Sequence, residues 1–415
     1  MAVGSELLTP YRIDSNSLYL TRRLNEFGIV VRAKSVVGDN RADLATHLRL
    51  MLARAPLVIT TGGLGPTADD LTREVVAEVL GRPLEEDPQI LDGIRARFDR
   101  RGVPMPSINR KQAQVPGGAI VLPNAHGTAP GLYFEDGGRV VVLLPGPPRE
   151  LQPMFEAHVA ARLAARMRGR TVHRRVLKMT GRSESQVEEV AEPIYSRLQN
   201  GPLPIDTTIL ASPGQIELHL SAGGRDAVAI DGALAAAVAS LESALNPFVF
   251  STDGRSLEEV VGDLLRVRKW MLAAAESCTG GLLLGRLTDV PGSSAWVTGG
   301  VVAYADDVKV RELGVAADVI AAYGVVSEPT AIAMAEGVRA RLGTDVGVSI
   351  TGIAGPGGGS PEKPVGTVAV AVAVAGLPST LARTFHFPGD RETVRRHSTS
   401  AALEMVRRAL VSESR

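Results

Sequence analysis

Two glycine-rich turns, each set between a short apolar run and a helix-like stretch, constrain the fold of this chain more than any other feature. The first follows the apolar residues 57–61 and reads TGGLGPTADD from Thr61. The second follows residues 270–275 and reads ESCTGG from Glu276. Apolar runs of this length are typical of buried strands, and glycine permits a tight turn from strand to helix. The pattern predicts strand–turn–helix units and therefore an α/β fold.

The remaining sequence divides into three segments. The 415 residues are too many for one hydrophobic core, so two or three domains are expected. In residues 1–165, strand-like stretches at 29–37, 57–61 and 140–144 alternate with helix-like stretches at 70–80 and 88–100. Residues 166–250 differ, with a basic cluster at 166–175 that we interpret as a solvated linker, a helix-like stretch at 183–198 and an alternating strand at 215–222.

Residues 255–415 return to the α/β pattern. Strands are expected at 268–275, 346–351, 366–374 and 384–387, and helices at 256–267, 330–342 and 390–411, the last with Asp390 as its N-cap. Alternating strands and helices predict a parallel sheet covered on both faces, with ligand-binding loops at the carboxyl ends of the strands. We therefore predict an α/β protein in which two three-layer αβα domains are joined by a small α+β module.

Charge and cysteine content exclude several classes of partner. The 45 basic residues balance the 45 acidic ones, so no overall field favours nucleic acid or an anionic membrane. One cysteine excludes an internal disulfide and a CxxC metal site, which fits a reducing cytoplasm. The longest apolar run, residues 365–377, contains glycines and is too short to span a bilayer. We expect a cytoplasmic protein without a membrane partner.

The beginning of the sequence is unusual for an α/β domain. A turn-like Gly4-Ser5-Glu6 follows only three residues, where five or six apolar residues are typical of a strand. We expect either a shortened first strand or a start placed too far downstream.

The first glycine turn has the composition of a phosphate site. Gly62, Gly63 and Gly65 allow a phosphate to approach backbone amides, and Asp69 and Asp70 are candidate ligands of a divalent cation beside it. The alternative is a structural turn in which Asp70 caps the next helix. A second, proline-stiffened loop containing Pro145 and Gly146 forms either a pocket wall or merely the end of a strand.

The second glycine turn begins a set of residues suited to hydrolysis. Small residues there leave backbone amides open for a ligand's anionic or carbonyl oxygen. Ser294, Tyr304 and Lys309 then follow within sixteen positions. A serine, a tyrosine and a lysine are sufficient for a hydrolase that uses neither histidine nor a metal ion.

Several ordered motifs resemble those of the CinA family. In the first segment these are GSELL, DSN at Asp14, VGDN, TGGLGPTADD, NRKQA, GTAPG and LPGPP. In the last segment they are AESCTGG, the stretch 287–294, TGIAGP and EKPVGT. The resemblance runs from about residue 3 to the end of the chain. It implies a molybdopterin-binding-like domain at 1–165, a KH-like module at 166–250 and a CinA C-terminal domain at 255–415.

The resemblance also implies two activities. The family's C-terminal domain deamidates nicotinamide mononucleotide (NMN) to nicotinic acid mononucleotide without a cofactor. Some members also hydrolyse ADP-ribose at the N-terminal domain with a divalent metal. Family members form homodimers, so we expect a homodimer acting on a small nucleotide. The N-terminal ligand site implied here includes Asp14 and Thr67 together with the two loops.

By the same resemblance, Ser294 is the nucleophile, Lys309 its base and Tyr304 the group that relays or orients the proton. Such a lysine must be held neutral by burial or neighbouring charges. The substrate-binding residues implied are Glu276, Ser277, Thr279, Gly280, Gly281, Thr351 and Arg391, the last suited to a phosphate. Many relatives have Tyr-Ser-Asn where this chain has Tyr304-Ala305-Asp306.

Other interpretations of these residues remain open. Ser277 is a rival nucleophile, whereas Cys278 more often packs in a core. Glu276 either binds a ribose hydroxyl or fixes the loop. In structural interpretations, Ser294 belongs to a turn, Tyr304 packs in the core, Lys309 is solvated at a helix start and Arg391 is an ordinary first-turn residue.

Two competing functions follow from the segments. One is a non-catalytic protein whose middle module contacts nucleic acid, but residues 166–250 lack a GxxG loop and offer only Tyr195, Phe248 and Phe250 for stacking. We therefore do not expect a nucleic-acid partner. The other is a pterin-binding or nucleotidyl-transfer protein, which the N-terminal fold suggests by analogy alone.

Overall fold

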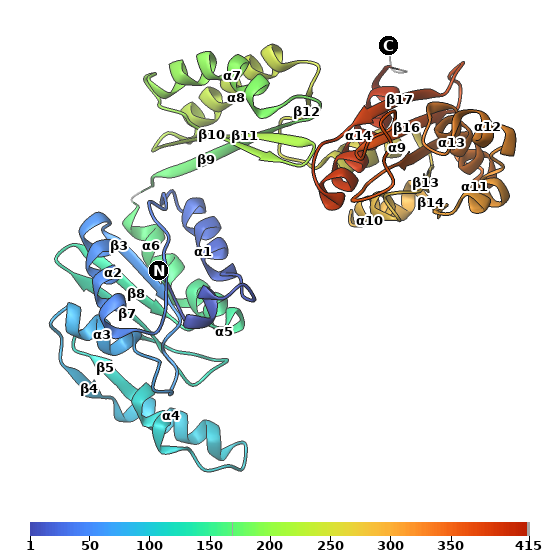
Figure 1. Ribbon diagram of the computed structural model, residues 1–415. Coiled ribbons are helices and arrows are strands. Elements are labelled where there is room, and N and C mark those ends of the chain that lie inside the picture. Colours follow the sequence, from blue (N-terminus) through green and yellow to red (C-terminus); the bar gives the residue numbers. More distant parts are fainter. Residues whose placement is uncertain (168, 413–415) are drawn as a thin grey trace. The chain divides into compact units, whose positions relative to one another are not determined.

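The computed structural model describes residues 1–167 and 169–412. The chain forms two compact units (Figure 1). The first comprises Met1–His173 with Gly223–Ala227, and the second comprises Arg174–Ala222 with Val228–Arg415. The second unit therefore contains both the middle module and the C-terminal domain.

The first unit is built on a six-stranded sheet in the order β2-β1-β3-β8-β7-β6. Its strands are β1 (Ala2–Val3), β2 (Val36–Val37), β3 (Leu57–Thr61), β6 (Ile120–Leu122), β7 (Gly131–Asp136) and β8 (Arg139–Leu144). The first four in the sheet order are parallel, whereas β7 pairs antiparallel with both β8 and β6, so the sheet is mixed. The strand predicted at 29–37 is wrong in extent, because only its last two residues pair with β1.

Helices cover both faces of this sheet. They are α1 (Ser15–Glu26), α2 (Arg41–Arg54), α3 (Thr72–Val79), α4 (Pro88–Asp99), α5 (Pro148–Met154) and α6 (Ala161–Arg166). A separate two-stranded antiparallel sheet pairs β4 (Leu84–Glu86) with β5 (Gln114–Pro116), and α4 lies between these strands in the sequence. Alternate residues of β8 enter opposite cores. Val140, Val142 and Leu144 pack with α1 and α5, whereas Val141 and Leu143 pack with residues of α2 and α3.

The middle module is a four-stranded sheet with two helices, and its KH-like character stays a prediction. Its elements are β9 (Thr171–Met179), α7 (Glu184–Gln199), β10 (Asp206–Ser212), β11 (Gln215–Gly224), α8 (Ala227–Leu245) and β12 (Val249–Ser251). The linker interpretation of 166–175 is wrong for its second half, because β9 begins at Thr171. In length and composition α8 meets the requirements for crossing a membrane, yet one stripe of it packs in the module's core.

The C-terminal domain has a five-stranded sheet in the order β14-β13-β15-β16-β17. The strands are β13 (Leu272–Glu276), β14 (Val297–Val302), β15 (Val346–Gly352), β16 (Thr367–Val374) and β17 (Leu381–His386). The helices are α9 (Leu257–Arg268), α10 (Leu282–Thr288), α11 (Asp306–Leu313), α12 (Ala317–Tyr323), α13 (Glu328–Leu342) and α14 (Arg391–Ser412). Strands β14, β13 and β15 are parallel, and β16 pairs antiparallel with both β15 and β17.

The sequence of β16, TVAVAVAV, explains the layering of this domain. Its valines enter one large core with residues of α9 and α14, and its alanines enter a second core with Ala331 and Ala335 of α13. Small alanines let α13 lie close to the sheet, while larger valines fill the space under α9 and α14. The α/β prediction is confirmed, and Asp390 caps α14 by accepting from the Thr393 amide at 2.8 Å.

Candidate active site

The first parts of the C-terminal site are the segments that follow β13 and β14. The Ala303 amide donates to the Glu276 carbonyl at 2.8 Å, which holds the two strand ends side by side. Ser277 and Tyr304 each come one residue later, so the structure brings them to the same sheet edge. On the other side of Ser277, its amide donates to the Ile350 carbonyl at 2.9 Å, next to Thr351.

The expected open amides of Gly280 and Gly281 are not open. Gly280 donates to the Ser277 carbonyl at 3.0 Å, and Gly281 donates to the Glu276 carboxylate at 3.1 Å. In contrast, Cys278 and Thr279 donate their amides to no other group in the part of the chain that the structure describes. The two free donors therefore directly follow Ser277. Gly281 has φ +92°, a conformation that favours glycine, as it turns the chain into α10.

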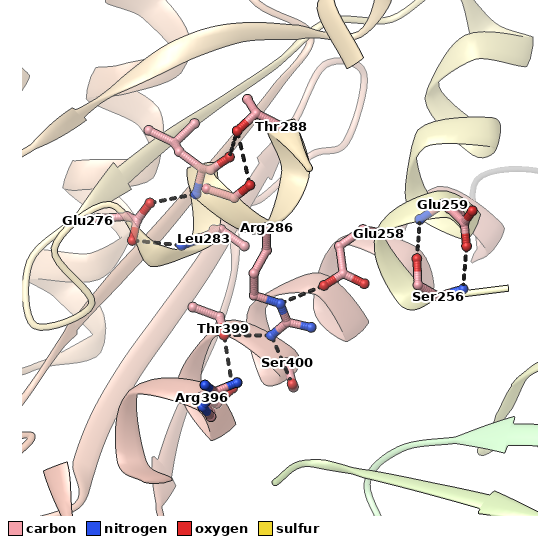
Figure 2. Close-up of polar contacts among 12 residues, drawn as sticks. Ser256, Glu258, Glu259, Glu276, Leu283, Arg286, Thr288, Arg396, Thr399 and Ser400 are labelled. Carbon is pink, nitrogen blue, oxygen red and sulfur yellow. Dashed lines mark hydrogen bonds and ion pairs between the residues drawn. The ribbon is translucent and has the colours of Figure 1, made fainter. Parts of the chain in front are cut away.

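Glu276 lies beneath this turn and not in contact with solvent. It is fully buried, and its carboxylate accepts from the Gly281, Leu283 and Leu284 amides at 2.9–3.1 Å. Figure 2 shows Glu276 bonded to Leu283 at the start of α10. The carboxylate thus occupies the anion site that the start of α10 would otherwise offer. The substrate-binding role expected for Glu276 is corrected, because its oxygens are committed to fixing the loop.

Contacts on the opposite side of α10 hold the helix in place. Arg286 donates to Glu258 of α9 at 2.6 Å and to the hydroxyls of Thr399 and Ser400 of α14 at 2.6 and 3.0 Å (Figure 2). Three helices are joined through one guanidinium, so the loop that carries Ser277 rests on a fixed support.

Tyr304 and Arg391 meet at the open edge. The Arg391 guanidinium donates to the Tyr304 hydroxyl at 2.9 Å and to the Gly355 carbonyl at 2.8 Å. Tyr304 is 58% exposed, so its interpretation as a core residue is wrong. Arg391 is likewise more than a first-turn residue, because it links the loops after β14 and β15.

Lys309 is buried although it lies in the first turns of α11. Only 2% of its side chain is exposed, and its Nζ donates to the Tyr304 carbonyl and to Asp306 Oδ1, both at 3.3 Å. The interpretation as a solvated residue is therefore wrong. Asp306 supplies the carboxylate that faces the Lys309 Nζ.

Ser294 is not brought together with Tyr304 and Lys309. It lies in the turn η4 (Ser293–Ala295) before β14, where the Trp296 carbonyl accepts from the first residue of β13. Tyr304 follows the other end of β14. Six strand residues span roughly 18–20 Å, so within one chain Ser294 and Tyr304 lie at opposite edges of the sheet.

The side chains of Cys278 and Thr351 are buried at the site and are not presented to an incoming ligand. Burial raises the pKa of the Cys278 thiol to about 12, which opposes a thiolate nucleophile. Thr351 is 1% exposed and donates its hydroxyl to the Val325 carbonyl at 2.8 Å. Its expected role in binding substrate is corrected to holding the loop before α13.

Sequence reasoning missed Arg395, one helical turn after Arg391. Its guanidinium donates to the Thr279 carbonyl at 2.6 Å, and its Nε is buried without a partner in the described residues, as is the Thr279 hydroxyl. The charges of Arg395 and Arg391 both act on Cys278. The i, i+4 spacing was the available signal, because it places both guanidinium groups on one face of α14.

The N-terminal unit has a separate cavity of about 840 Å³. All nine residues predicted for its ligand site line this cavity: Asp14, Gly62, Gly63, Gly65, Thr67, Asp69, Asp70, Pro145 and Gly146. The Gly62 amide is taken by the Leu144 carbonyl at 2.9 Å. Those of Gly63 and Gly65 have no partner among residues 1–167 and 169–412 and remain open for a phosphate.

Two side chains order the wall of this cavity. Asp14 caps α1 by accepting from the Ser17 amide at 3.0 Å. Asn16, which sequence reasoning did not select, donates to the Gly146 carbonyl at 2.6 Å, and its Oδ1 is buried without a partner within the described chain. A buried, unpartnered amide oxygen that lines a cavity favours a ligand with a hydrogen-bond donor.

Asp70 does not cap the following helix, because the N-cap of α3 is Leu71. Its Oδ2 instead accepts from the Thr67 amide at 2.9 Å and the Thr67 hydroxyl at 2.5 Å. The described residues contain no group of three or more His, Cys, Asp or Glu side chains that could hold a metal ion. A cation at Asp69 and Asp70 would therefore take its remaining ligands from a bound phosphate and water.

Comparisons with known proteins cover both units. Residues 1–165 match the probable molybdopterin binding domain family, and residues 254–410 match the CinA C-terminal domain. A CinA-like protein of Koribacter versatilis is 45% identical over 415 residues, 99% of each chain. A putative competence-damage inducible protein of Symbiobacterium thermophilum is 47% identical over 421 residues, covering 99% of this chain and 97% of that protein. The crystal structure of the competence/damage inducible protein CihA from Agrobacterium tumefaciens shares 38% identity with a TM-score of 0.36, covering 38% of this chain and 97% of that one.

Proposed function

This chain belongs to the CinA family, and from that premise we propose that its C-terminal domain hydrolyses the carboxamide of NMN, giving nicotinic acid mononucleotide and ammonia. The observation that carries the proposal is that Ser277 and Tyr304 follow adjacent strand ends and that the buried Lys309 Nζ lies 3.3 Å from the Tyr304 carbonyl. Amide hydrolysis needs a nucleophile, a proton acceptor and donors for the oxyanion, and this edge supplies all three.

Each residue has a defined role in the proposed reaction. The Ser277 hydroxyl attacks the carboxamide carbon, and its proton passes through the Tyr304 hydroxyl to the Lys309 amine. The amides of Cys278 and Thr279 stabilise the oxyanion. The carbon–nitrogen bond then breaks, ammonia leaves with the returned proton, and water hydrolyses the acyl-serine. Arg391 and Arg395 bind the nucleotide phosphate as charge-assisted donors.

The choice of Ser277 over Ser294 follows from the placement of β14. A nucleophilic Ser294 requires a second copy of the chain, because its own Tyr304 lies at the far edge of the sheet. The homodimer expected from the family resemblance keeps that alternative testable.

Ammonia release from NMN without added metal tests this proposal. We expect Ser277→Ala to lose at least about 10³-fold in kcat, and Ser294→Ala and Cys278→Ala to retain activity. Arg391→Gln should chiefly raise KM, because it removes a phosphate contact. The absence of ammonia release by the unmodified protein would refute the amidase assignment.

Loss of activity in Ser294→Ala alone would refute the role of Ser277. Mixing Ser294→Ala with Tyr304→Phe chains would then show whether two copies complement each other. Restored activity in the mixture would mean that the site is shared between copies.

For the N-terminal unit we propose binding of a phosphorylated ligand, with ADP-ribose as the expected substrate and a divalent metal as cofactor. The open Gly63 and Gly65 amides in a cavity of about 840 Å³ support this proposal. Incubation with ADP-ribose and Mg²⁺ should yield AMP, and Asp69→Asn should reduce the rate. Unchanged turnover in Asp69→Asn would exclude that residue as a metal ligand.

A further inference from the structure

A third cavity, of about 640 Å³, lies within the second compact unit. We name it the Phe248 cleft. Its walls come from the segments around Arg182, Gly214 and Phe248 of the middle module and from β17 and α14 of the C-terminal domain. The Gly214 carbonyl accepts from the Thr180 hydroxyl at 2.8 Å, which fixes the β10–β11 turn in one wall. The candidate amidase residues do not line this cleft.

Parallel aromatic rings form one wall of the cleft. Phe385 stacks on Phe387 with ring centres 5.4 Å apart and planes at 12°. Phe387 stacks in turn on His397 at 5.3 Å and 18°. All three side chains are half-buried, and together with Phe248 they border the cavity. Stacked, partly exposed rings are suited to a planar aromatic ligand.

Arginines border the same cavity beside these rings. The Arg182 guanidinium lies 4.2 Å from the centre of the Phe248 ring, and that of Arg383 lies 4.8 Å from the centre of Phe385. Neither forms an ion pair with a carboxylate within residues 1–167 and 169–412. Arg408 also faces Phe248 at 5.7 Å, but it is paired with Glu404.

Glu184 and Glu404 also line the cleft, so its three arginines exceed its carboxylates by one positive charge next to the aromatic rings. A planar ring joined to an anion satisfies both features, because the ring extends the stack while a phosphate pairs with Arg182 and Arg383. A cavity of this volume is within the usual range for small-molecule sites. Phe385, Phe387 and His397 come from β17, the residue after it and α14, so residues 166–250 contribute only Phe248 to the rings of this cleft.

We propose that the Phe248 cleft binds a nucleoside phosphate, whose base displaces a guanidinium from the face of Phe385 or Phe248 and whose phosphate pairs with the displaced Arg182 or Arg383. This site is separate from the proposed amidase site and does not depend on it. The same chemistry is presented by a free nucleotide and by the end of a nucleic-acid single strand, and the experiment below distinguishes the two.

The test is photolabelling of the full chain with 8-azido-AMP, followed by mapping of the labelled peptides. We expect label in peptides that contain Arg182, Phe248 or Phe385. The double variant Arg182→Gln/Arg383→Gln should reduce this labelling about tenfold. The matched control Arg396→Gln changes an exposed arginine of α14 that pairs with Glu392, and it should label like the unmodified chain.

Competitors identify the form of the ligand. Competition by AMP alone indicates a free nucleotide, whereas stronger competition by a ten-residue oligo(dA) indicates a strand end. Fluorescence anisotropy of the competing oligo(dA) provides a second measurement. Labelling confined to other peptides, or labelling at the cleft that is equal in the double variant, would overturn the proposal. Label at the amidase loop is found in different peptides from label at the cleft. A negative result at one site therefore leaves the result at the other site interpretable.

Discussion

The substitution Glu276→Gln distinguishes a residue that builds the site from one that binds substrate. Glu276 is fully buried, and its two carboxylate oxygens accept from three backbone amides at the start of α10. Glutamine has nearly the same shape but only one acceptor oxygen. In its better orientation the oxygen accepts from Gly281 and Leu283, and the Leu284 amide then faces an NH₂ group without a partner.

The expected cost follows from these contacts. One buried, unpaired amide costs about 1–3 kcal/mol. Loss of a negative charge at a helix start adds about 1 kcal/mol. The free energy of unfolding should therefore fall by about 2–4 kcal/mol, which corresponds to a shift of roughly 1–2 M in the urea midpoint for a domain of this size.

Tryptophan fluorescence measures this change selectively. The chain has two tryptophans, Trp270 and Trp296, and both belong to the C-terminal domain. Glu259→Gln is the matched control, because glutamine can still accept from the Ser256 amide in the capping box at the start of α9 (Figure 2). That variant should change stability by less than about 0.5 kcal/mol. An unchanged midpoint in Glu276→Gln together with a raised KM for NMN would refute the reasoning and return Glu276 to substrate binding.

Three further predictions follow from single residues. Burial raises the pKa of the Cys278 thiol to about 12, so only about one thiol in 10⁴ is ionised in the folded chain at pH 8. Cys278 should therefore resist iodoacetamide at pH 8 in the folded chain and react with it in urea. Rapid labelling of the folded chain would contradict its burial. Burial lowers the pKa of His397, so the unfolded chain binds a proton at this residue more readily, and the free energy of unfolding should fall as the pH drops below the ordinary histidine range. In His397→Asn, the loss of stability between pH 7.5 and 5.5, measured by tryptophan fluorescence, should be smaller. An equal loss in that variant would exclude His397 as the source of the pH dependence. Gly62→Ala should destabilise the N-terminal unit by about 2 kcal/mol or more in thermal unfolding, because at φ +94° its new Cβ would lie 2.2 Å from the Val3 carbonyl oxygen. The control Gly102→Ala is also at positive φ but in open space, so it should lower the stability less. Equal losses of stability would mean that the contact with Val3 is irrelevant.

Local sequence patterns determined most of the elements. The alternating valines and alanines of β16 specify a strand with two different buried faces, because the side-chain period of a strand is two. Strand β3 lies where the apolar run predicted it, and Asp390 caps α14 as expected. Residues 29–35 failed to form a strand, because pairing depends on a neighbour and β1 offers only Ala2 and Val3.

The sequence indicated which residue types form the candidate site, but not where their side chains lie in the folded protein. The glycine turns and the polar residues after β13 and β14 identify a reactive sheet edge, because parallel strands end together. Sequence alone suggested open amides at Gly280 and Gly281, since nothing local reveals that the Glu276 side chain folds back to accept from the start of α10. Sequence alone also did not indicate Arg395, because its role depends on its contact with the loop after β13, against which α14 packs.

The sequence by itself thus determined the α/β class, the positions of the turns and the inventory of chemical groups, since these depend on periodicity and on residue type. Only the tertiary structure decided which groups meet. The direction of β14 separates Ser294 from Tyr304, and the packing of α11 buries Lys309. The Phe248 cleft joins side chains about two hundred positions apart. Such proximity is a property of strand order and helix packing, which no local pattern encodes.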